Sequence, residues 1–441
     1  MEQRRKNLTQ LFIPICLETL LYMLSGMVDT LMLSSVNDQA VGAVGTANTY
    51  IGIFIIMFSV ISSGMVAVMT QNIGAGRPGV AYQARQLGLA FNAVLGVIMS
   101  LFLSLGAGTI LSGVGVADAL MQPAKTYLQI VGGFCILNAL IPICSSYLRA
   151  FGFSKEPLYA SIIGNVINFC LNAFFLFVLH KGVAGVATAT VISRIINLVI
   201  VVLLGAVLVK AKQHPERESN RAVMGQIIRI GLPSACEPAI YNVSMTLVIR
   251  FLNQMDAQGL NVTARSYTMQ ITNFSYCVGA ALAQANAIMT GWHIGAKEYD
   301  ACDRGTKKAA VIGVIVAVIL ETVFTLCSGW IMQLFSKDPQ MVSLVGKLLA
   351  IDIVLEIGRV TNLVYGQALK TSGDAVFPVV MGACFMILCS VGGTYLFGIR
   401  LGLLAVGAYI GMTGDECVRA VGMYLRWKSG KWKEKGLVKS R

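Results

Sequence analysis

Long apolar runs recur along the whole chain and constrain its fold more than any other feature. Each has at least about 20 residues, the length that crosses the hydrocarbon core of a bilayer as a helix. Inside a bilayer the backbone polar groups must be bonded within the segment, which a helix achieves. The sequence therefore predicts an all-α membrane protein. Twelve runs are distinguished, at residues 9–34, 40–72, 80–111, 119–148, 156–179, 182–210, 226–254, 260–291, 303–335, 339–369, 376–398 and 401–426.

The composition supports the membrane interpretation. Hydrophobic residues make up 56% of the 441 positions and charged residues only 12%, whereas soluble domains carry about 25% charged residues. The eleven cysteines are scattered, mostly inside apolar runs and without a C-x-x-C pair. This usage is typical of buried small hydrophobic residues in a protein without disulfides.

The positive charge is unevenly distributed along the chain. The net charge of +13 comes mainly from Lys and Arg in the N-terminal arm, in every second loop and in the tail. This bias predicts that both termini are cytoplasmic in a multi-pass protein of a bacterial-type plasma (inner) membrane. The basic tail, 427–441, is expected to lie against anionic lipid. Membrane lipids, and not nucleic acid, are the partners that this charge indicates.

The two halves of the chain repeat each other at an offset of about 220 residues. Pro14-x-x-x-Glu18-x-x-x-Tyr22 returns as Pro233-x-x-x-Glu237-x-x-x-Tyr241, and Leu148-Arg149-x-x-Gly152 returns as Leu369-Lys370-x-x-Gly373. An offset kept in the same order indicates a duplicated unit. Because six spans are even in number, the repeats are expected to be parallel six-helix bundles. The predicted organisation is an N-lobe at 1–210, a cytoplasmic linker at 211–224, a C-lobe at 225–426 and the tail.

Ionisable residues within the apolar runs are candidates for function, because a charge at mid-bilayer costs about 2.5–3.5 kcal/mol. The first run carries Glu18 and Asp29, and the fifth carries a polar stripe of Asn165, Asn168 and Asn172. A carboxylate among amide oxygens suits a proton or a hard cation such as Na⁺. The alternative is that the asparagines only bond helices together.

The second half carries a different set of charges. Glu237 repeats Glu18, but the position equivalent to Asp29 is Val248. The tenth run instead holds Asp352, Glu356 and Arg359 at helical spacing, so they share one face. Two interpretations remain open, a structural ion pair and a charge network that a proton or substrate rearranges. Arg194, Asp415, Glu416 and Arg419 are expected to be interfacial or paired.

Aromatic and amide side chains suggest a binding cavity. Tyr22, Tyr241 and Asn273 could line such a cavity together with Glu18. Aromatic rings and the twenty methionines would suit apolar cations of varied shape. Packing is the alternative role for most of them.

Several motifs together resemble the multidrug and toxic compound extrusion (MATE) transporters over essentially the whole chain. The first run ends in Val28-Asp29-Thr30, and Gln71 to Gly76 resembles the family's Gln-x-x-Gly-Ala-Gly turn. The turns at 148–152 and 369–374 resemble its paired Leu-Arg-x-x-Gly-Asp turns, and 164–168 and 189–193 resemble its fifth and sixth helices.

The resemblance implies cation-coupled efflux through two six-helix lobes with a central cavity. It places Asp29, Asn168, Asn172 and Thr190 on the family's N-lobe cation site. Asn172 stands where many relatives have a second aspartate, which favours H⁺ over Na⁺, and no metal beyond Na⁺ at Asp29 is implied. Arg359 replaces a helix-ten aspartate of some relatives, so Glu237 and Glu356 remain as C-lobe candidates.

The leading hypothesis is secondary active efflux of organic cations or other amphipathic compounds by alternating access, driven by H⁺ or Na⁺. No Gly-x-x-x-x-Gly-Lys-Ser/Thr motif indicates a nucleotide motor, and no other cofactor is expected. The main alternative is a lipid-linked precursor flippase of the same superfamily. An intramembrane enzyme is disfavoured because no nucleophile, paired-Asp or metal constellation is evident, and a passive channel is a further alternative. The protein is expected to be a monomer.

Overall fold

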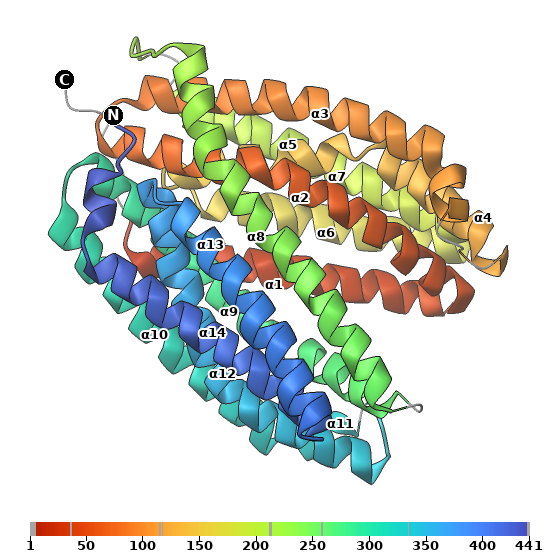
Figure 1. Ribbon diagram of the computed structural model, residues 1–441. Coiled ribbons are helices and arrows are strands. Elements are labelled where there is room, and N and C mark those ends of the chain that lie inside the picture. The colour runs from red at the N-terminus through yellow and green to blue at the C-terminus, as the bar shows by residue number, and fades with distance from the viewer. Residues whose placement is uncertain are drawn as a thin grey trace. The chain divides into compact units, whose positions relative to one another are not determined.

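The computed structural model describes residues 6–35, 38–113, 116, 118–210, 214–256, 259–333 and 335–438. The chain divides into two compact units, unit 1 (Met1–Gly231) and unit 2 (Leu232–Arg441). Figure 1 shows the helices of both units along the chain. The predicted linker at 211–224 and the predicted tail lie partly outside the described residues, at 211–213 and 439–441.

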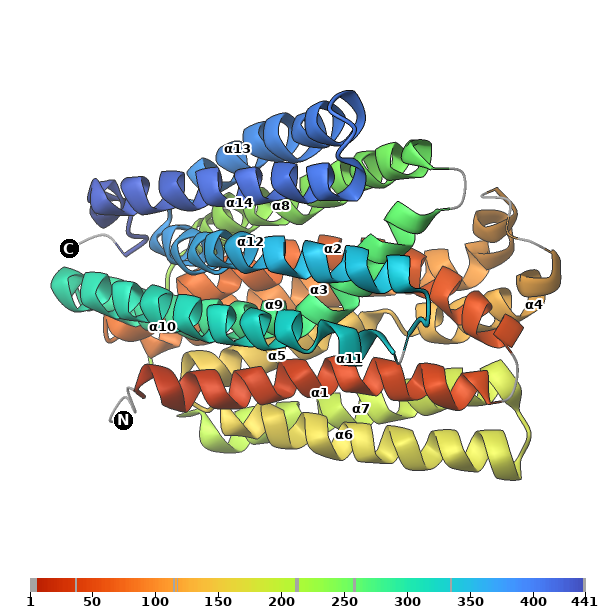
Figure 2. The same cartoon turned by 90° about the horizontal axis from the view of Figure 1, so that it is seen from below.

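Unit 1 contains six helical stretches of membrane length and the first turns of a seventh. Its helices α1 and α6 run side by side, as do α2 and α3 and also α6 and α7 (Figures 1 and 2). The elements are α1 (Leu8–Ser34), α2 (Asp38–Gly74), α3 (Pro78–Gly113), α4 (Asp118–Tyr127), η1 (Leu128–Gly132), α5 (Ile136–Ala150), α6 (Lys155–Ala173), η2 (Phe174–Val178) and α7 (Gly182–Leu208).

Unit 2 is organised around one long helix, α12, which packs against α9, α10 and α14. The elements from the unit boundary onward are α8 (Asn220–Met255), α9 (Leu260–Gly295), α10 (Tyr299–Leu326), α11 (Ser328–Met332), α12 (Pro339–Ser372), α13 (Val376–Phe385), η4 (Met386–Val391), η5 (Thr394–Arg400), α14 (Leu404–Lys428) and η6 (Lys431–Glu434).

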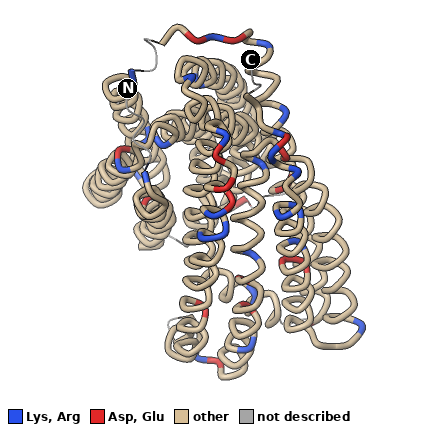
Figure 3. The backbone as a smooth tube through the Cα atoms, turned by 90° about the vertical axis from the view of Figure 1, so that its left-hand side faces the viewer, with Lys and Arg blue, Asp and Glu red and all other residues tan. Residues whose placement is uncertain are grey.

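These elements place one helical stretch at each of the twelve predicted runs, which confirms the twelve-helix prediction. Among the described residues, seven helices are individually long and apolar enough to cross a membrane, and the pair 118–132 and 136–150, bent by 43°, adds an eighth. The remaining long helices, α8, α9, α12 and α14, carry more charged or polar residues. Figure 3 shows long stretches of the backbone without a charged residue.

The outer helix faces are apolar, which is the reverse of a soluble protein. Leu105 is 83% exposed, Val207 71% and Leu326 80%. Such faces would drive aggregation in water and fit contact with lipid. The protein is therefore a multi-pass membrane protein.

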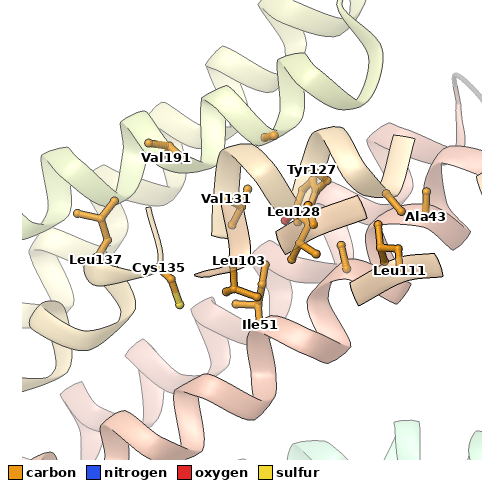
Figure 4. Packing of buried hydrophobic residues seen from close by; sticks show 14 of the residues in the cluster. Ala43, Ile51, Leu103, Leu111, Tyr127, Leu128, Val131, Cys135, Leu137 and Val191 are labelled. Atoms are coloured by element: carbon orange, nitrogen blue, oxygen red, sulfur yellow. The ribbon is translucent and has the colours of Figure 1, made fainter. Parts of the chain in front are cut away.

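The core of unit 1 joins helices that are distant in sequence. Ile51 of α2, Leu103 of α3, Tyr127 of α4 and Val191 of α7 belong to one buried cluster (Figure 4). Small residues of the same cluster are fully buried, among them Ala43, Ala47 and Ala107. They let the helix backbones approach closely, which is how helices associate in membranes.

A pair of glycines lets two helices of unit 1 cross at close range. Gly64 of α2 faces the backbone carbonyl of Ile227 in α8, and Gly231 of α8 faces the carbonyl of Val60. A Cβ atom at either glycine would overlap the opposite backbone. We expect Gly231→Ala to lower the thermal unfolding midpoint in detergent, because overpacking costs about 1–3 kcal/mol.

Gly225→Ala is the matched control, since Gly225 lies on the same helix with open space around it. Alanine there should hold or raise the midpoint, because it favours a helix by about 1 kcal/mol over glycine. Equal midpoints for the two variants would contradict the assigned role of the crossing.

The chain after α14 folds back onto unit 2. The rings of Trp427 and Trp432 stack at 4.2 Å, and both side chains are 1% exposed. Asp374, just after α12, accepts hydrogen bonds from Arg426 at 2.7 Å and from Lys435 at 2.8 Å. The first part of the predicted tail is thus packed against protein. Contact of the tail with lipid stays a prediction.

The Asp374 contacts make the stability of unit 2 pH-dependent. Burial acts to raise the pKa of Asp374, but the hydrogen bonds from Arg426 and Lys435 outweigh burial and hold the pKa below its ordinary value of 3.8. A lowered folded pKa gives stability that is complete above the ordinary value and is lost as pH falls through the folded value. At neutral pH, Asp374→Asn should cost about 1.5–3 kcal/mol, as for hydrogen bonds to charged groups.

The measurement is the thermal midpoint of wild type and Asp374→Asn across pH. The gap between them should be constant near neutral pH and should shrink below about pH 4. The thermal midpoint of Lys435→Met should lie below that of wild type by a smaller amount, and this difference should depend on pH in the same way. If the midpoint difference between wild type and Asp374→Asn is unchanged in acid, the charge of Asp374 is not the source of the stabilisation.

Candidate functional site

The Asp29 carboxylate in unit 1 is held by the asparagine stripe of α6. Asn172 donates a hydrogen bond from Nδ2 to Asp29 Oδ1 at 2.6 Å and another to Asn168 Oδ1 at 3.2 Å. Asn172 is completely buried and its own Oδ1 has no hydrogen-bond partner. The structure thus brings three of the four residues of the predicted N-lobe site together.

Thr190, the fourth residue, is buried on α7, and its hydroxyl donates to the Val186 carbonyl at 2.9 Å. Within the described parts of the chain, no hydrogen bond joins Thr190 to Asp29. Arg194 of the same helix is close enough for its charge to attract Asp29, and Tyr127 also lies near both charges. No pattern in the sequence indicates that Arg194 would come close enough for its charge to act on Asp29.

The duplicated glutamates occupy equivalent ion pairs in their own units. Arg149 contacts Glu18 at 2.6 Å in unit 1. Lys370 contacts Glu237 in unit 2. Arg149 and Lys370 are the counterparts in the repeated Leu-Arg/Lys-x-x-Gly turns. The repeat therefore extends from sequence to side-chain contacts.

Unit 2 contains a larger network centred on Arg419 of α14. Its guanidinium contacts Asp415 at 2.8 Å, Glu416 at 2.8 Å and Glu237 at 3.8 Å. Arg419 is only 2% exposed. The expected pairing of Asp415, Glu416 and Arg419 is found, but these residues lie inside the unit and link Glu237 to α14.

Arg359 of α12 continues the network. It donates to Glu356 Oε1 and contacts Glu416 Oε1 at 3.7 Å, and Asn362 donates to Glu416 Oε2 at 3.1 Å. The structure thus shows the Glu356–Arg359 pair that the spacing predicts. Both interpretations of that pair, structural and rearranging, are compatible with these contacts.

The structure adds Glu321 of α10, which was not among the residues predicted from the sequence. Glu321, Asp352 and Glu356 each offer a carboxylate oxygen, and these oxygens lie within 4.8 Å of one another. All three side chains are at most 1% exposed. A single Glu in the apolar part of the ninth run was the available signal, by the same reasoning that selected Asp29.

The predicted cavity residues are divided between the units. Tyr22 lies on α1 in unit 1 and is 69% exposed, and Glu18 is largely buried against Arg149. Tyr241 packs against a buried hydrophobic cluster of unit 2, and Asn273 lies exposed on α9. A cavity lined by these residues stays a prediction.

Comparisons with known proteins identify relatives over nearly the whole chain. The MatE family model matches residues 14–174 and 233–396, one match in each half. The uncharacterized transporter YisQ of Bacillus subtilis (strain 168) is 34% identical over 431 residues, covering 96% of this chain and 94% of YisQ. The probable multidrug resistance protein NorM of Thermotoga maritima is 23% identical over 450 residues, covering 98% and 94%.

Solved structures share the fold. The crystal structure of a MATE protein in the straight conformation superposes with a TM-score of 0.88 at 20% identity, covering 97% of this chain and 96% of that chain. A MOP superfamily transporter from Pyrococcus furiosus Vc1 (DSM3638) superposes with a TM-score of 0.83 at 18% identity, covering 98% of this chain and 96% of that chain. At these identities the superpositions concern the fold alone.

Proposed function

Because this chain belongs to the MATE family of membrane transporters and is not an enzyme, we propose that it exports organic cations and other amphipathic compounds by alternating access, in exchange for H⁺ or Na⁺. The names of several relatives, which describe probable multidrug resistance proteins, support this class of cargo. No nucleotide-binding loop is found in the sequence, so an ion gradient would supply the energy.

The observation that carries the proposal is the Asp29 carboxylate bonded to Asn172 inside a membrane-length helix pair. An acidic residue there is costly unless it is used or paired. Asn172 of α6 donates through one amide nitrogen to Asp29 of α1 and to Asn168, which lies one turn earlier on α6. Asn172 therefore links the two helices. Its buried, unbonded Oδ1 is available to an entering cation.

The proposed mechanism starts with entry of H⁺ or Na⁺ at Asp29. The cation neutralises the carboxylate and weakens its attraction to Arg194. A proton would bind a carboxylate oxygen of Asp29 and weaken the hydrogen bond that Asn172 donates to it. Na⁺ would instead be held by oxygen atoms of Asp29, Asn168 and Asn172. Either event repacks α1 against α6 and α7, and this repacking drives release of the cargo.

The remaining parts of the proposal concern topology. The positive-inside distribution supports cytoplasmic termini in a bacterial-type plasma membrane. Because each unit closes its own core, a monomer is the proposed transport form. The lipid-linked precursor flippase is disfavoured, since the MatE match and the acidic Asp29 site support small cationic cargo.

The test uses the purified full chain in lipid vesicles with a fluorescent cationic dye as cargo. A pH gradient and a Na⁺ gradient are imposed separately, each with a matched salt control. We expect the dye to move uphill under one of the two gradients and to stop moving when that gradient is dissipated. Dye movement that ignores both gradients would reject coupled export and revive the flippase or channel alternatives.

A further inference from the structure

The chain after the last long helix is fixed to one end of unit 2. Helices α12 and α14 end there, and α10 begins there (Figure 2). Because α10 is long and apolar enough to cross a membrane, this shared end of the helices lies at a membrane surface. We call residues 426–437, which close it, the C-terminal clasp.

Aromatic side chains hold the clasp against the protein. The stacked rings of Trp427 and Trp432 also meet Tyr365 of α12 at 6.2 Å and Tyr299 of α10 at 5.9 Å, respectively. Both indole nitrogens are bonded, from Trp427 Nε1 to Asp303 Oδ1 at 2.9 Å and from Trp432 Nε1 to the Trp427 carbonyl at 2.9 Å. Tryptophan near a membrane surface commonly lies in the lipid interface. Here both rings are instead buried in protein.

A buried aspartate fastens the clasp near both of its ends. Asp374 is 1% exposed and accepts hydrogen bonds from Arg426 and Lys435 through different oxygens. Gly373 lets the chain lie close, because a Cβ atom there would overlap the Lys435 carbonyl. The clasp is therefore an ordered part of unit 2 and not a free tail.

The remaining lysines of the clasp face outward. Lys428, Lys431 and Lys433 are exposed, and no ion pair joins them to any residue that the structure describes. Lys433 lies 5.8 Å from the centre of the Trp432 ring. The clasp thus has one face bound to protein and one face that carries positive charge.

Asp303 joins this positive face to the start of α10. One of its oxygens accepts from Trp427 and the other from Lys307 at 2.7 Å. Lys433 of the clasp is close enough for its charge to act on the same carboxylate. Basic residues from two segments that are distant in sequence therefore meet beside Asp303.

Basic side chains outnumber acidic ones in these two segments, 297–308 and 426–437. Clusters of this kind at the end of a membrane helix are typical of binding to anionic lipid, and each basic residue strengthens it about fivefold. Among their described side chains, those that are exposed and have no ion pair are the basic Lys297, Arg304, Lys308, Lys428, Lys431 and Lys433 and the acidic Asp300 and Glu434.

We propose that the docked C-terminal clasp and the start of α10 form one binding surface for the headgroups of anionic lipids. The tryptophans stay in the protein and hold the clasp lysines beside those of α10. A soluble polyanion could meet the same charges, but at the ends of membrane-spanning helices lipid headgroups are always present. Bound lipid would stabilise the docked clasp, because it binds the folded arrangement. This surface is independent of transport through Asp29.

The experiment uses the purified full chain in an uncharged detergent. Phosphatidylglycerol, which is anionic, and phosphatidylcholine with the same acyl chains are titrated separately, and the thermal midpoint is followed. We expect phosphatidylglycerol to raise the midpoint in a saturable way and phosphatidylcholine to raise it much less. Added salt should weaken the effect of phosphatidylglycerol, because exposed charges are screened.

A pair of lysine substitutions tests the charge of the clasp. Lys428→Gln/Lys431→Gln should weaken the apparent affinity for phosphatidylglycerol at least about fivefold. Lys337→Gln/Lys347→Gln is the matched control, with the same change at two exposed lysines around the start of α12. This control should bind phosphatidylglycerol nearly as wild type does.

Trp432→Ala tests whether the clasp must be docked. It should release the clasp while every basic residue is kept, and a released segment loses entropy when it is ordered again on lipid. We expect at least about fivefold weaker binding, the contribution of one basic residue, and faster hydrogen exchange in residues 426–437. Trp330→Ala is the control, because Trp330 is 81% exposed on α11. In wild type, slow exchange of the clasp should persist when phosphatidylglycerol binds.

Four outcomes would overturn this surface. They are equal effects of the two lipids on wild type, equal binding by the two lysine variants, binding by Trp432→Ala as tight as wild type, and loss of slow exchange in the clasp when lipid is added. A DNA oligonucleotide or polyglutamate that stabilises the protein more than phosphatidylglycerol would assign the surface to a soluble polyanion and also reject lipid. If Trp432→Ala does not fold, the lysine variants decide.

Discussion

Asp29→Asn is expected to abolish uphill export of the cationic dye in vesicles while the protein folds and inserts normally. Asparagine keeps the size of the side chain but cannot carry the charge that binds H⁺ or Na⁺. The Asn172 amide can still donate to the new side-chain oxygen, so the contact between α1 and α6 is largely kept. The initial rate under the coupling gradient should fall at least about tenfold, equivalent to about 1.4 kcal/mol or more of lost cation binding.

The matched control is Asp118→Asn, the same substitution at an exposed position at the start of α4. It should export at the wild-type rate. Thermal midpoints of both variants show whether a loss of transport reflects a loss of folded protein. Unchanged gradient-driven export by Asp29→Asn would reject the coupling role of this carboxylate, whatever unit 2 binds.

Arg419→Met should destabilise unit 2 more than any other single substitution considered for this protein. The side chain is 2% exposed and forms ion pairs with Asp415, Glu416 and Glu237. Methionine fills the volume but leaves Asp415 without a cation, while Glu416 keeps only Arg359 and Glu237 keeps only Lys370. Removing one partner of a buried ion pair typically costs about 3–5 kcal/mol. We therefore expect a large drop in thermal midpoint or a loss of monodisperse protein in detergent.

Arg400→Met is the matched control, because Arg400 is exposed and bonds Tyr395 at 2.9 Å. It should change the midpoint little. Adding Asp415→Asn to Arg419→Met should recover part of the stability by removing one of the stranded charges. Similar midpoints for Arg419→Met and Arg400→Met would show that the network does not stabilise the fold.

The helices could be predicted from the sequence because hydrophobicity over 20 residues is a local property. Each predicted run coincides with a helical stretch, including the run at 119–148, which the structure bends by 43°. The bend was not predicted, although Gly132 and Gly133 lie beside it. The two-unit division falls at Gly231, inside α8, because Gly231 crosses α2 in unit 1.

The side-chain contacts were harder to predict from the sequence. Spacing placed Asn168 and Asn172 on one face, but their contact with Asp29 depends on how α1 packs on α6, which no single helix specifies. Arg419 and Glu416 lie near the end of a predicted run, which suggests an interfacial position, yet α14 continues to Lys428 and buries both. Glu321 was missed because its partners come from other helices.

The repeated ion pair has an evolutionary consequence. Because Glu18–Arg149 and Glu237–Lys370 are each complete within one half, the duplication copied a balanced pair and created no unpaired charge. In both halves the basic residue contacts one oxygen of the glutamate and a residue of another helix approaches the second oxygen. In the first half Glu18 Oε1 accepts a hydrogen bond from the Ser161 hydroxyl at 3.4 Å. In the second half that oxygen lies 3.8 Å from Arg419. The same position is therefore occupied by a neutral hydroxyl in one half and by a cation in the other, so among the described residues the second glutamate alone connects to a larger charge network.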